Sequence, residues 1–292
     1  TPEAPIIQHH LNKMLENGCK YAVIETSSHG LSTKLNRCGN IIFDCGLFMN
    51  VTLEHLEFHK NFETYKNDKA NLFRALDKHS HVKLIAGERV KISPIGIVNL
   101  EDPSADFFAN STKQDVWGFT SLGKAGKAAT EETILPQIPS KVQNIVTATN
   151  IQSTSNDLKF EMKVNIGGKN EQYFIESLLP GAFNTYNIMA SILAVHNLSN
   201  IEISKIVKKI KDLSPVKGRM TKINQNQPFE VIVDYAHTPS SFETIFPPIR
   251  KRCNGKMICI FGSGGERDLT KRPIQGEIAA KYCDVVILAD ED

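Results

Sequence analysis

The stretch MICIFGSGGERDLTKRPIQGEIAAKYCDVVIL, residues 257–288, decides the fold class of the second half of the chain. An apolar run at Met257–Phe261 precedes a glycine-rich loop, a helical pattern and a second apolar run at Val285–Leu288. The run Val231–Val233, which precedes another helical pattern, begins the same alternation upstream. Strands that alternate with helices predict a parallel, doubly wound sheet.

The first half of the chain also indicates an α/β fold. Helical spacing over Ile6–Leu15 is followed by strand-like runs at Tyr21–Ile24 and Ile41–Val51, each with polar residues at its carboxyl end. The alternating stretch 142–179 contains the turn Gly167-Gly168 and predicts an antiparallel meander. We therefore expect a mostly parallel sheet with a small antiparallel meander.

The remaining elements follow from the spacing of apolar residues. We expect strands at 82–86, 95–100 and 116–120, and helices at 62–78, 182–198 and 203–213. The best candidate for a linker is Ser214-Pro215-Val216-Lys217-Gly218. Because one domain commonly has ~100–200 residues, we predict two domains, at 1–214 and 215–292.

Composition excludes several classes of protein. Hydrophobic residues make up 41% and charged residues 23% of the 292 residues, as in ordinary globular proteins, which argues against disorder. The longest apolar runs are shorter than the ~20 residues that a bilayer requires. A net charge of +2, with Lys and Arg scattered among acids, disfavours nucleic acid as a partner. We expect a soluble protein with no membrane or nucleic-acid partner.

The cysteines and the ends of the chain bear on its context. None of the six cysteines forms a C-x-x-C pair, which favours reduced thiols and a cytoplasmic location. The sequence opens at Thr1 without Met or a leader, and it stops soon after the apolar run Val285–Leu288. We interpret it as a piece of a longer protein.

Two polar residues of the first domain follow predicted strands. Glu25 ends the run Tyr21–Ile24, and His55 lies in the polar stretch after Ile41–Val51. Both could bind a hard cation such as Mg²⁺, which prefers oxygen ligands, although imidazole is a less usual ligand for it. For either residue alone, a helix cap or a surface hydrogen bond is the commoner role.

Lys69 is the one charge on the apolar stripe of the predicted helix 62–78. An ammonium in such a place extends to solvent, finds a partner or loses its charge. Extension to solvent is the ordinary outcome. The alternative is a lysine carbamate, in which CO2 converts the amine into an anionic ligand with two oxygens that could bind Mg²⁺.

The loop Gly262–Arg267 of the second domain follows a strand and precedes a helix. That context suits an anion held by backbone N–H groups. As a dinucleotide fingerprint the loop is weak, because Arg267 replaces the third glycine, and a turn without a ligand is commoner. Asp234–Pro239 also ends a strand, where Asp234 could simply cap a helix. Arg219 could position a phosphate or belong to a turn that joins domains.

Taken together, a set of motifs resembles the Mur ligases in order and spacing over nearly the whole chain. These motifs are Thr1–Glu3, Glu25–Leu31, Asn50–His59, Tyr65–Phe73, Gly181–Asn184, Gly218–Met220, Asp234–Pro239 and Gly262–Pro273. The resemblance implies a central ATPase domain, which would begin here just after its P-loop, and a truncated Rossmann-like C-terminal domain. No G-x-G-K-[ST] motif occurs in the sequence, so we expect this piece alone to lack ligase activity.

The resemblance also implies an ATP-dependent acid–amino-acid ligase of peptidoglycan biosynthesis, a pathway of cell wall biogenesis, cell shape and cell division. Its cofactors would be ATP and Mg²⁺, and its partners UDP-N-acetylmuramoyl-L-alanyl-D-glutamate and a free amino acid. ATP would phosphorylate the glutamate side chain to an acyl phosphate, and the amino acid would displace phosphate to become the third residue. We expect a monomer.

Roles carry over to residues that match the motifs. The resemblance implies that Glu25, His55 and carbamylated Lys69 hold Mg²⁺, and that Thr1 and Ser27 bind the muramoyl-dipeptide. It implies that Asn187 binds adenine and that Arg219, Asp234 and His237 bind the nucleotide. Arg267 would bind the carboxylate of the amino acid. After Leu31 the sequence departs from the family, and Arg37 is a candidate substitute for the substrate arginine.

The amino acid that is added depends on the end of the chain. Diaminopimelate enzymes of the family carry D-N-P-R, whereas this chain ends in Glu291-Asp292. An acidic Asp292 in that place indicates a basic side chain such as lysine or ornithine, but the sequence leaves diaminopimelate, lysine and ornithine all open.

Other functions remain open at this point. Folylpolyglutamate synthases and cyanophycin-synthetase-like ligases share the architecture, although the segments Ser27–Gly30 and His55–His59 favour the muramoyl branch. A nicotinamide-dependent oxidoreductase would use the loop Gly262–Arg267. A non-catalytic module that binds the cell-wall precursor is a further alternative.

Overall fold

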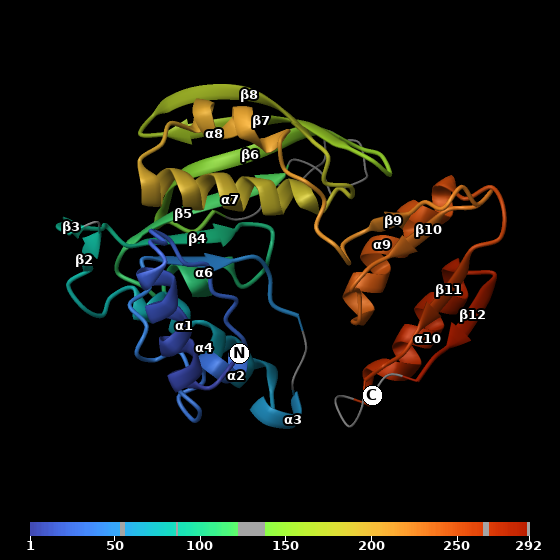
Figure 1. Ribbon diagram of the computed structural model, residues 1–292, viewed down its shortest axis with the longest axis horizontal. Helices are drawn as coiled ribbons and strands as arrows, with labels where there is room; N and C mark the ends of the chain where they lie inside the picture. The colour runs from blue at the N-terminus through green and yellow to red at the C-terminus, as the bar shows by residue number, and fades with distance from the viewer. Residues whose placement is uncertain (53–55, 86, 122–137, 265–268, 291–292) are drawn as a thin grey trace.

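The computed structural model describes residues 1–52, 56–85, 87–121, 138–264 and 269–290. Figure 1 shows a larger body, which contains the elements α1 to α8, and beside it a smaller body that contains β9 to β12. The predicted boundary at 214/215 falls between α8 and β9, in a stretch without helix or strand. It stays a prediction.

The larger body is built on a six-stranded sheet in the order β1-β4-β5-β6-β7-β8. The strands are β1 (Cys45–Phe48), β4 (Ile95–Asn99), β5 (Asp115–Ser121), β6 (Val142–Ser153), β7 (Leu158–Ile166) and β8 (Lys169–Ser177). The first four are parallel, whereas β7 and β8 are antiparallel and meet at the turn Gly167-Gly168. The predicted meander is confirmed, and it continues the parallel sheet.

Two apolar clusters cover opposite faces of this sheet. Ile97 of β4 packs with Ile188 and Ile192 of α7 (Asn184–Ser199), whereas its neighbour Val98 packs with Phe108 on the other face. Neighbouring strand residues point to opposite faces, so a strand buried on both sides is apolar throughout. This explains the continuous apolar run of β4.

Shorter helices surround the sheet. They are α1 (Ala4–Glu16), α2 (Ser28–Leu31), α3 (Leu56–His59), α6 (Ala105–Ala109) and α8 (Ile203–Ile210). The predicted helix 62–78 is divided at the buried Ala70 into α4 (Phe62–Lys69) and α5 (Asn71–Ala75). Lys69 therefore ends a helix instead of lying in the middle of one. Next comes a hairpin of β2 (Val82–Ile85) and β3 (Glu88–Lys91), of which only the first strand was predicted.

The predicted strand Tyr21–Ile24 is wrong. The segment pairs with no strand among the described residues, and the exposed fractions of Tyr21 and Val23 are 59% and 99%. β-branched and aromatic residues favour strands, but a strand exists only where a neighbour completes its hydrogen bonds. Here apolar composition without a paired neighbour leaves exposed, irregular chain before Glu25.

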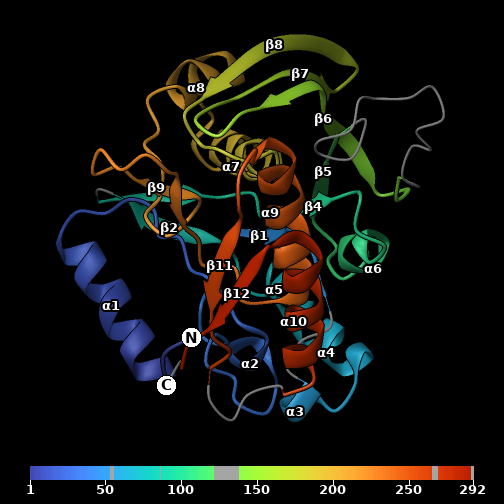
Figure 2. The ribbon, with the colours of Figure 1, turned by 90° about the vertical axis from the view of Figure 1, so that its right-hand side faces the viewer.

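The smaller body contains β9 (Thr221–Ile223), β10 (Val231–Val233), α9 (Pro239–Arg252), β11 (Ile258–Phe261), α10 (Lys271–Tyr282) and β12 (Val285–Leu288). As predicted, β11 and β12 are parallel with α10 between them in sequence. β10 instead pairs antiparallel with β9, which the sequence did not indicate. Figure 2 shows α9 and α10 beside one another, next to β11 and β12.

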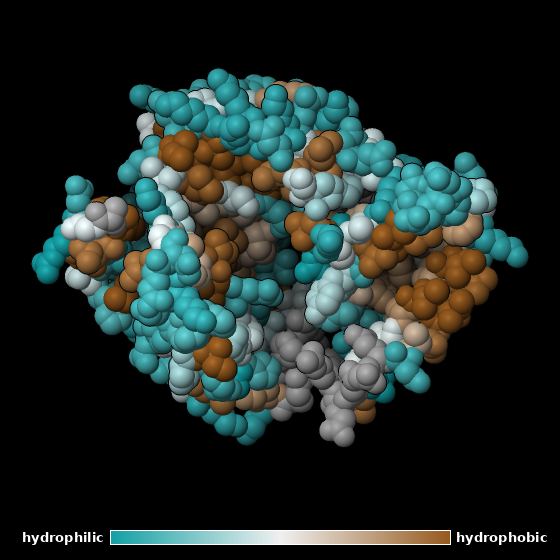
Figure 3. Space-filling model, in the orientation of Figure 1, coloured by the Kyte–Doolittle hydropathy of each residue, from teal (hydrophilic) through white to brown (hydrophobic). Residues whose placement is uncertain are grey.

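The strands β11 and β12 also present apolar side chains to solvent. The exposed fractions of Ile260 and Leu288 are 67% and 74%, and Figure 3 shows apolar side chains gathered over these strands. Among the described residues, no helix has the length and apolarity that a membrane crossing requires.

Candidate functional site

Thr1 and Ser27, the predicted dipeptide-binding residues, lie side by side. Thr1 Oγ1 is 2.7 Å from Ser27 Oγ, and the Ser27 backbone N–H donates to Thr1 Oγ1 at 3.0 Å. Ser27 also caps α2 by accepting a hydrogen bond from the Gly30 backbone N–H at 3.1 Å. The two hydroxyl groups are therefore held in one place by backbone and side-chain hydrogen bonds.

Arg37 joins the same cluster. Its Nη1 donates to the Thr1 carbonyl oxygen at 2.9 Å, and its Nη2 forms an ion pair with Glu3. Its buried Nε has no hydrogen-bond partner among the described residues. The structure thus places the candidate substitute for the substrate arginine next to Thr1. Its binding role stays a prediction.

A buried histidine that the sequence analysis did not single out lies beside this cluster. His59 Nδ1 is 3.0 Å from Asp68 Oδ2, and its Nε2 is 2.9 Å from Ser28 Oγ. The side chain of His59 is fully buried. Because a carboxylate only accepts, Nδ1 donates to Asp68, and in the neutral imidazole Nε2 accepts from the Ser28 hydroxyl.

His59 connects the three stretches that carry the predicted metal ligands. Ser28 follows shortly after Glu25, His59 lies in α3 shortly after His55, and Asp68 directly precedes Lys69. Spacing along the sequence gave no sign of this connection, because Ser28 and Asp68 are 31 and 9 residues from His59.

The metal ligands themselves are only partly described. Glu25 is exposed, and Lys69 is half-buried at the end of α4, with its Nζ 5.2 Å from the centroid of the Tyr65 ring. His55 lies outside the described residues, as do Arg267 and Asp292. Among the residues with defined positions, no group of three His, Cys, Asp or Glu side chains is arranged to hold a metal.

Hydrogen bonds of Asp102 fix the chain just before the stretch that contains His55. Asp102 Oδ2 accepts a hydrogen bond from the Val51 backbone N–H at 2.9 Å, while its Oδ1 accepts from the Ser104 N–H at 2.8 Å. Val51 comes directly before the stretch that leads to His55. The chain is therefore fixed on both sides of that stretch, by Asp102 before it and by His59 after it.

The predicted adenine residue Asn187 is exposed on the first turns of α7. Its Nδ2 donates to Asn184 Oδ1 at 2.9 Å, and Asn184 Nδ2 donates to the Pro180 carbonyl oxygen at 2.7 Å. These two bonds orient the Asn187 amide. An amide offers both a donor and an acceptor, which is what reading an adenine edge requires.

A polar cluster secures the same end of α7. Tyr186 donates to Glu101 Oε2 at 2.8 Å, and its hydroxyl oxygen is 2.9 Å from Ser121 Oγ. Burial, together with the neighbouring Glu101 carboxylate, raises the pKa of Tyr186, so the phenol stays a neutral donor. Glu101 and Ser121 lie at the carboxyl ends of β4 and β5, the side where open α/β sheets bind ligands.

The structure brings Arg219, Asp234 and His237 together around Tyr235. The Arg219 guanidinium lies 4.8 Å from the centroid of the Tyr235 ring, and the His237 ring centroid is 5.1 Å from that centroid. Asp234 accepts from the backbone N–H groups of Met220 at 2.7 Å and Ala236 at 2.8 Å. Asp234 thereby ties the turn that carries Arg219 to the turn that carries His237.

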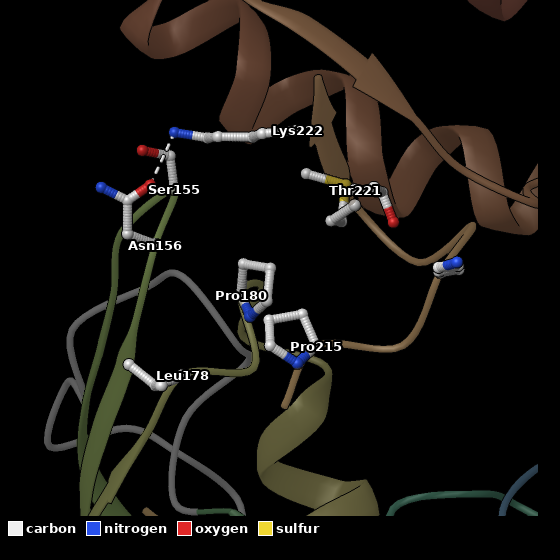
Figure 4. Close-up of a pocket in the computed structure, with 9 residues that line it drawn as sticks. Ser155, Asn156, Leu178, Pro180, Pro215, Thr221 and Lys222 are labelled. Carbon is white, nitrogen blue, oxygen red and sulfur yellow. Dashed lines mark hydrogen bonds between the residues drawn. The ribbon is translucent and has the colours of Figure 1, made fainter. Parts of the chain in front are cut away.

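A cavity of about 270 Å³ lies where the two bodies meet (Figure 4). Pro180 and Leu178 line it from the larger body, and Pro215 and Met220 from the connecting stretch. Lys222 Nζ donates to Asn156 Oδ1 at 2.7 Å across this junction. None of the predicted site residues that the structure describes lines this cavity.

Comparison with known proteins identifies both halves of the chain. Residues 1–195 match the model of the Mur ligase middle domain, and residues 218–292 match that of the Mur ligase glutamate ligase domain. The chain is 48% identical over 295 residues to the UDP-N-acetylmuramyl-tripeptide synthetase of Treponema denticola, covering 100% of this chain and 52% of that protein.

Two further proteins extend the comparison. The chain is 33% identical over 293 residues to the UDP-N-acetylmuramoyl-L-alanyl-D-glutamate–2,6-diaminopimelate ligase of Clostridium perfringens, covering 100% of this chain and 52% of the relative. A solved structure of a diaminopimelate ligase of that name aligns with a TM-score of 0.62 at 22% identity, over 100% of this chain and 52% of the other. The chain thus spans about half the length of the curated relatives it matches.

Proposed function

Because the chain belongs to the Mur ligase family, we propose that it contributes to an ATP-dependent ligase that extends UDP-N-acetylmuramoyl-L-alanyl-D-glutamate by a third amino acid. The observation that carries this proposal is that Thr1, Ser27 and Arg37 form one cluster. The cluster lies beside His59, which is bonded to Ser28. These residues come from separate stretches, and the family resemblance assigns Thr1 and Ser27 to the muramoyl-dipeptide.

The cluster suits an anionic substrate. The Arg37 guanidinium, which pairs with Glu3 in this structure, carries donors in a planar fork that matches carboxylates, so a substrate carboxylate would compete with Glu3 for it. The hydroxyl groups of Thr1 and Ser27 can both donate and accept. In the proposed reaction Thr1, Ser27 and Arg37 hold the dipeptide so that its glutamate side chain faces ATP. Such positioning converts a bimolecular encounter into a step within one complex.

The donor set fits Mg²⁺. Glu25, His55 and a carbamylated Lys69 would hold the ion, and two of the three would offer the oxygen ligands that it prefers. Lys69 ends α4 beside Asp68, which bonds His59, and Val51 bonds Asp102, so described residues next to two of the three ligands have side-chain hydrogen bonds. When bound, Mg²⁺ would neutralise charge on the phosphoryl group during transfer.

The smaller body would complete the nucleotide site. Asn187 would bind adenine, while Arg219, Asp234 and His237 would approach the phosphates when the two bodies close. Arg267 would bind the carboxylate of the incoming amino acid. We propose that this amino acid is lysine, ornithine or diaminopimelate, and the acidic Asp292 in the sequence favours one of the first two.

We place this ligase in the cytoplasm and expect a monomer. All six cysteines are free, as expected in a reducing compartment. The curated relatives reported above are named as muramyl ligases, which favours this function over a folylpolyglutamate synthase or a cyanophycin-synthetase-like ligase. A nicotinamide-dependent oxidoreductase would instead require tight binding of NAD to the smaller body.

The test is phosphate release by the full-length protein with ATP, UDP-N-acetylmuramoyl-L-alanyl-D-glutamate and one amino acid at a time. We expect release that depends on both the dipeptide and the amino acid, with lysine or ornithine preferred. Phosphate release that is independent of the dipeptide, or that requires a folate, would overturn the proposal. Preference for diaminopimelate would overturn only the choice of amino acid.

Lys69→Ala tests the proposed carbamate in the same assay. We expect this variant to lose turnover and a short carboxylate such as acetate to restore part of it, because the added anion can replace the missing oxygen ligand. Full activity of the variant without acetate would contradict the carbamate.

A further inference from the structure

We infer that His59 is a positioning residue, which through Ser28 and Asp68 fixes the three stretches that carry Glu25, His55 and Lys69. The inference rests on the proposed function, because it concerns the site at which that function would take place. It goes beyond the family resemblance, which assigned no role to His59, Ser28 or Asp68.

The geometry of the three residues is that of a serine–histidine–acid chain. Ser28 Oγ lies 2.9 Å from His59 Nε2, and Asp68 Oδ2 lies 3.0 Å from His59 Nδ1. In hydrolases such a chain activates the serine as a nucleophile. Here the exposed fractions of Ser28 and His59 are only 1% and 2%, so a substrate cannot reach the hydroxyl group. The chain therefore serves position rather than nucleophilic attack.

Directional bonds make His59 suitable for this role. Each of its two ring nitrogens has a partner on a different helix, Ser28 on α2 and Asp68 on α4. A movement of either helix away from α3 lengthens one of these bonds, and a hydrogen bond weakens steeply with poor geometry. An apolar contact would tolerate the same movement.

Aromatic packing restricts the imidazole further. The ring centroids of Phe58, Tyr65 and His29 lie 4.7, 5.3 and 5.4 Å from that of His59. Tyr65 in turn contacts Lys69, whose Nζ lies 5.2 Å from its ring centroid. A rotation of His59 would disturb the residues around Lys69 as well as the two hydrogen bonds.

The chain provides a matched control in a second buried histidine. His81 Nδ1 is 3.0 Å from Asp44 Oδ1, and its Nε2 is 2.9 Å from the Leu76 carbonyl oxygen. Its exposed fraction is 5%. Asp44 precedes β1, at the opposite end of that strand from Val51 and the His55 stretch. His81→Gln therefore removes a second buried histidine away from the proposed metal site, although both of its ring nitrogens face acceptor oxygens, whereas Nε2 of His59 faces a hydroxyl group.

The experiment measures Mn²⁺ affinity by electron paramagnetic resonance in the full-length protein with a non-hydrolysable ATP analogue. We expect His59→Gln to weaken Mn²⁺ binding ~10- to 100-fold, as is typical when a group that orients a metal ligand is lost. His81→Gln should lower the melting temperature comparably and leave Mn²⁺ affinity unchanged. Asp68→Asn, which keeps an acceptor oxygen for Nδ1, should retain more affinity than Asp68→Ala.

Steady-state kinetics distinguish a role of His59 in positioning the metal ligands from a role in protein stability alone. In His59→Gln we expect a raised KM for Mg²⁺ and a lowered kcat, with little change in the KM for the amino acid. Ser28→Ala serves as a milder variant, and it should shift Mn²⁺ affinity in the same direction.

The outcomes distinguish this inference from the proposed function. If Lys69→Ala loses Mn²⁺ binding while His59→Gln and Asp68→Ala keep it, the positioning role is wrong and the proposed site stands. If the wild-type protein binds no Mn²⁺ in the presence of the nucleotide analogue, both are overturned.

Discussion

The side-chain oxygens of Thr1 and Ser27 lie 2.7 Å apart, although 26 residues separate the two in sequence. The pair is bound from both sides: Ser27 holds the start of α2, and the Thr1 carbonyl oxygen accepts from Arg37 at 2.9 Å. A change at Thr1 should therefore affect substrate binding more than folding, because most of its contacts hold the cluster and not the core.

We predict that Thr1→Val raises the KM for the muramoyl-dipeptide about tenfold, since one hydrogen bond contributes roughly 0.5–1.5 kcal/mol and ~1.4 kcal/mol is tenfold. Valine keeps the shape of threonine but offers Ser27 no hydroxyl group. Steady-state kinetics of the full-length protein checks this. The KM for ATP serves as the internal control and should stay constant. An equal rise of both values would show a general loss of structure.

A substitution at Gly30 provides a second test of whether Thr1 binds the dipeptide. A Cβ added at Gly30 would lie 2.8 Å from Thr1 Cγ2, closer than side chains approach. We expect Gly30→Ala to displace Thr1 and raise the KM for the dipeptide at least as much as Thr1→Val. The KM for the dipeptide in the Gly30→Ala protein measures this. A KM at the wild-type value would mean that Thr1 does not bind the dipeptide.

Gly276→Ala is the control for Gly30→Ala, because the added methyl group would meet no neighbouring atom. A Cβ at Gly276 meets no atom within 4 Å, and the residue lies inside α10. Alanine favours helix over glycine by ~0.8–1.0 kcal/mol, so we expect this variant to be more stable by about that amount. Denaturant unfolding of the smaller body checks the prediction. A destabilised protein would show that α10 is not the helix described here.

The polar cluster at the start of α7 leads to a prediction about ATP. Tyr186→Phe removes a donor from Glu101, a part-buried carboxylate, and such a loss costs roughly 1–3 kcal/mol of stability. Asn187 directly follows Tyr186, so we also expect a several-fold rise in the KM for ATP, in keeping with the loss of one hydrogen bond.

A matched control for Tyr186→Phe exists on the sheet surface. Tyr173 donates to Glu171 there, where burial and that carboxylate raise the pKa of Tyr173 to about 12. Tyr173→Phe removes the same kind of bond on β8, an edge strand that three strands separate from β4 and Glu101, and the KM for ATP should not change. If both variants raise it equally, the cluster at Glu101 has no special part in nucleotide binding.

Most of the sheet could be predicted from the sequence because buried strands leave a strong local pattern. Ile95–Asn99 is apolar on both faces, and the turn Gly167-Gly168 marks the hairpin of β7 and β8. The strand at Tyr21–Ile24 was wrong for a physical reason: pairing depends on a neighbour, and no local pattern reports whether one exists. Pairing of β10 with β9 was missed for the same reason.

Residues of the candidate site could be predicted only where they belong to a sequence motif of the family. Thr1, Ser27 and Arg37 were named from the family resemblance, and the structure brings them together. His59 was missed because its partners Ser28 and Asp68 are set by the packing of α2, α3 and α4, which no spacing in the sequence encodes. The binding roles of all these residues stay predictions, and His55, Arg267 and Asp292 also lie outside the described residues.

The carboxylate of Asp77 makes stability depend on pH. Although burial opposes the effect, hydrogen bonds from the Lys113 backbone N–H and the side chains of Gln114 and Thr112 lower the pKa of Asp77 from its ordinary 3.8. A carboxyl group with a lowered pKa in the folded state contributes stability above its ordinary pKa, and that contribution is lost as the pH falls through the lowered value. We therefore expect stability to decline on acidification below about pH 4.

Asp77→Asn tests this assignment. The variant should be less stable than wild type near neutral pH, and its stability should fall less steeply below about pH 4, because asparagine does not titrate there. Thermal melts at a series of pH values measure both effects. Asp106→Asn, a change at an exposed carboxylate of α6, controls for the loss of one negative charge. Parallel pH profiles for wild type and Asp77→Asn would show that the bonds from Lys113, Gln114 and Thr112 do not hold the ionised form.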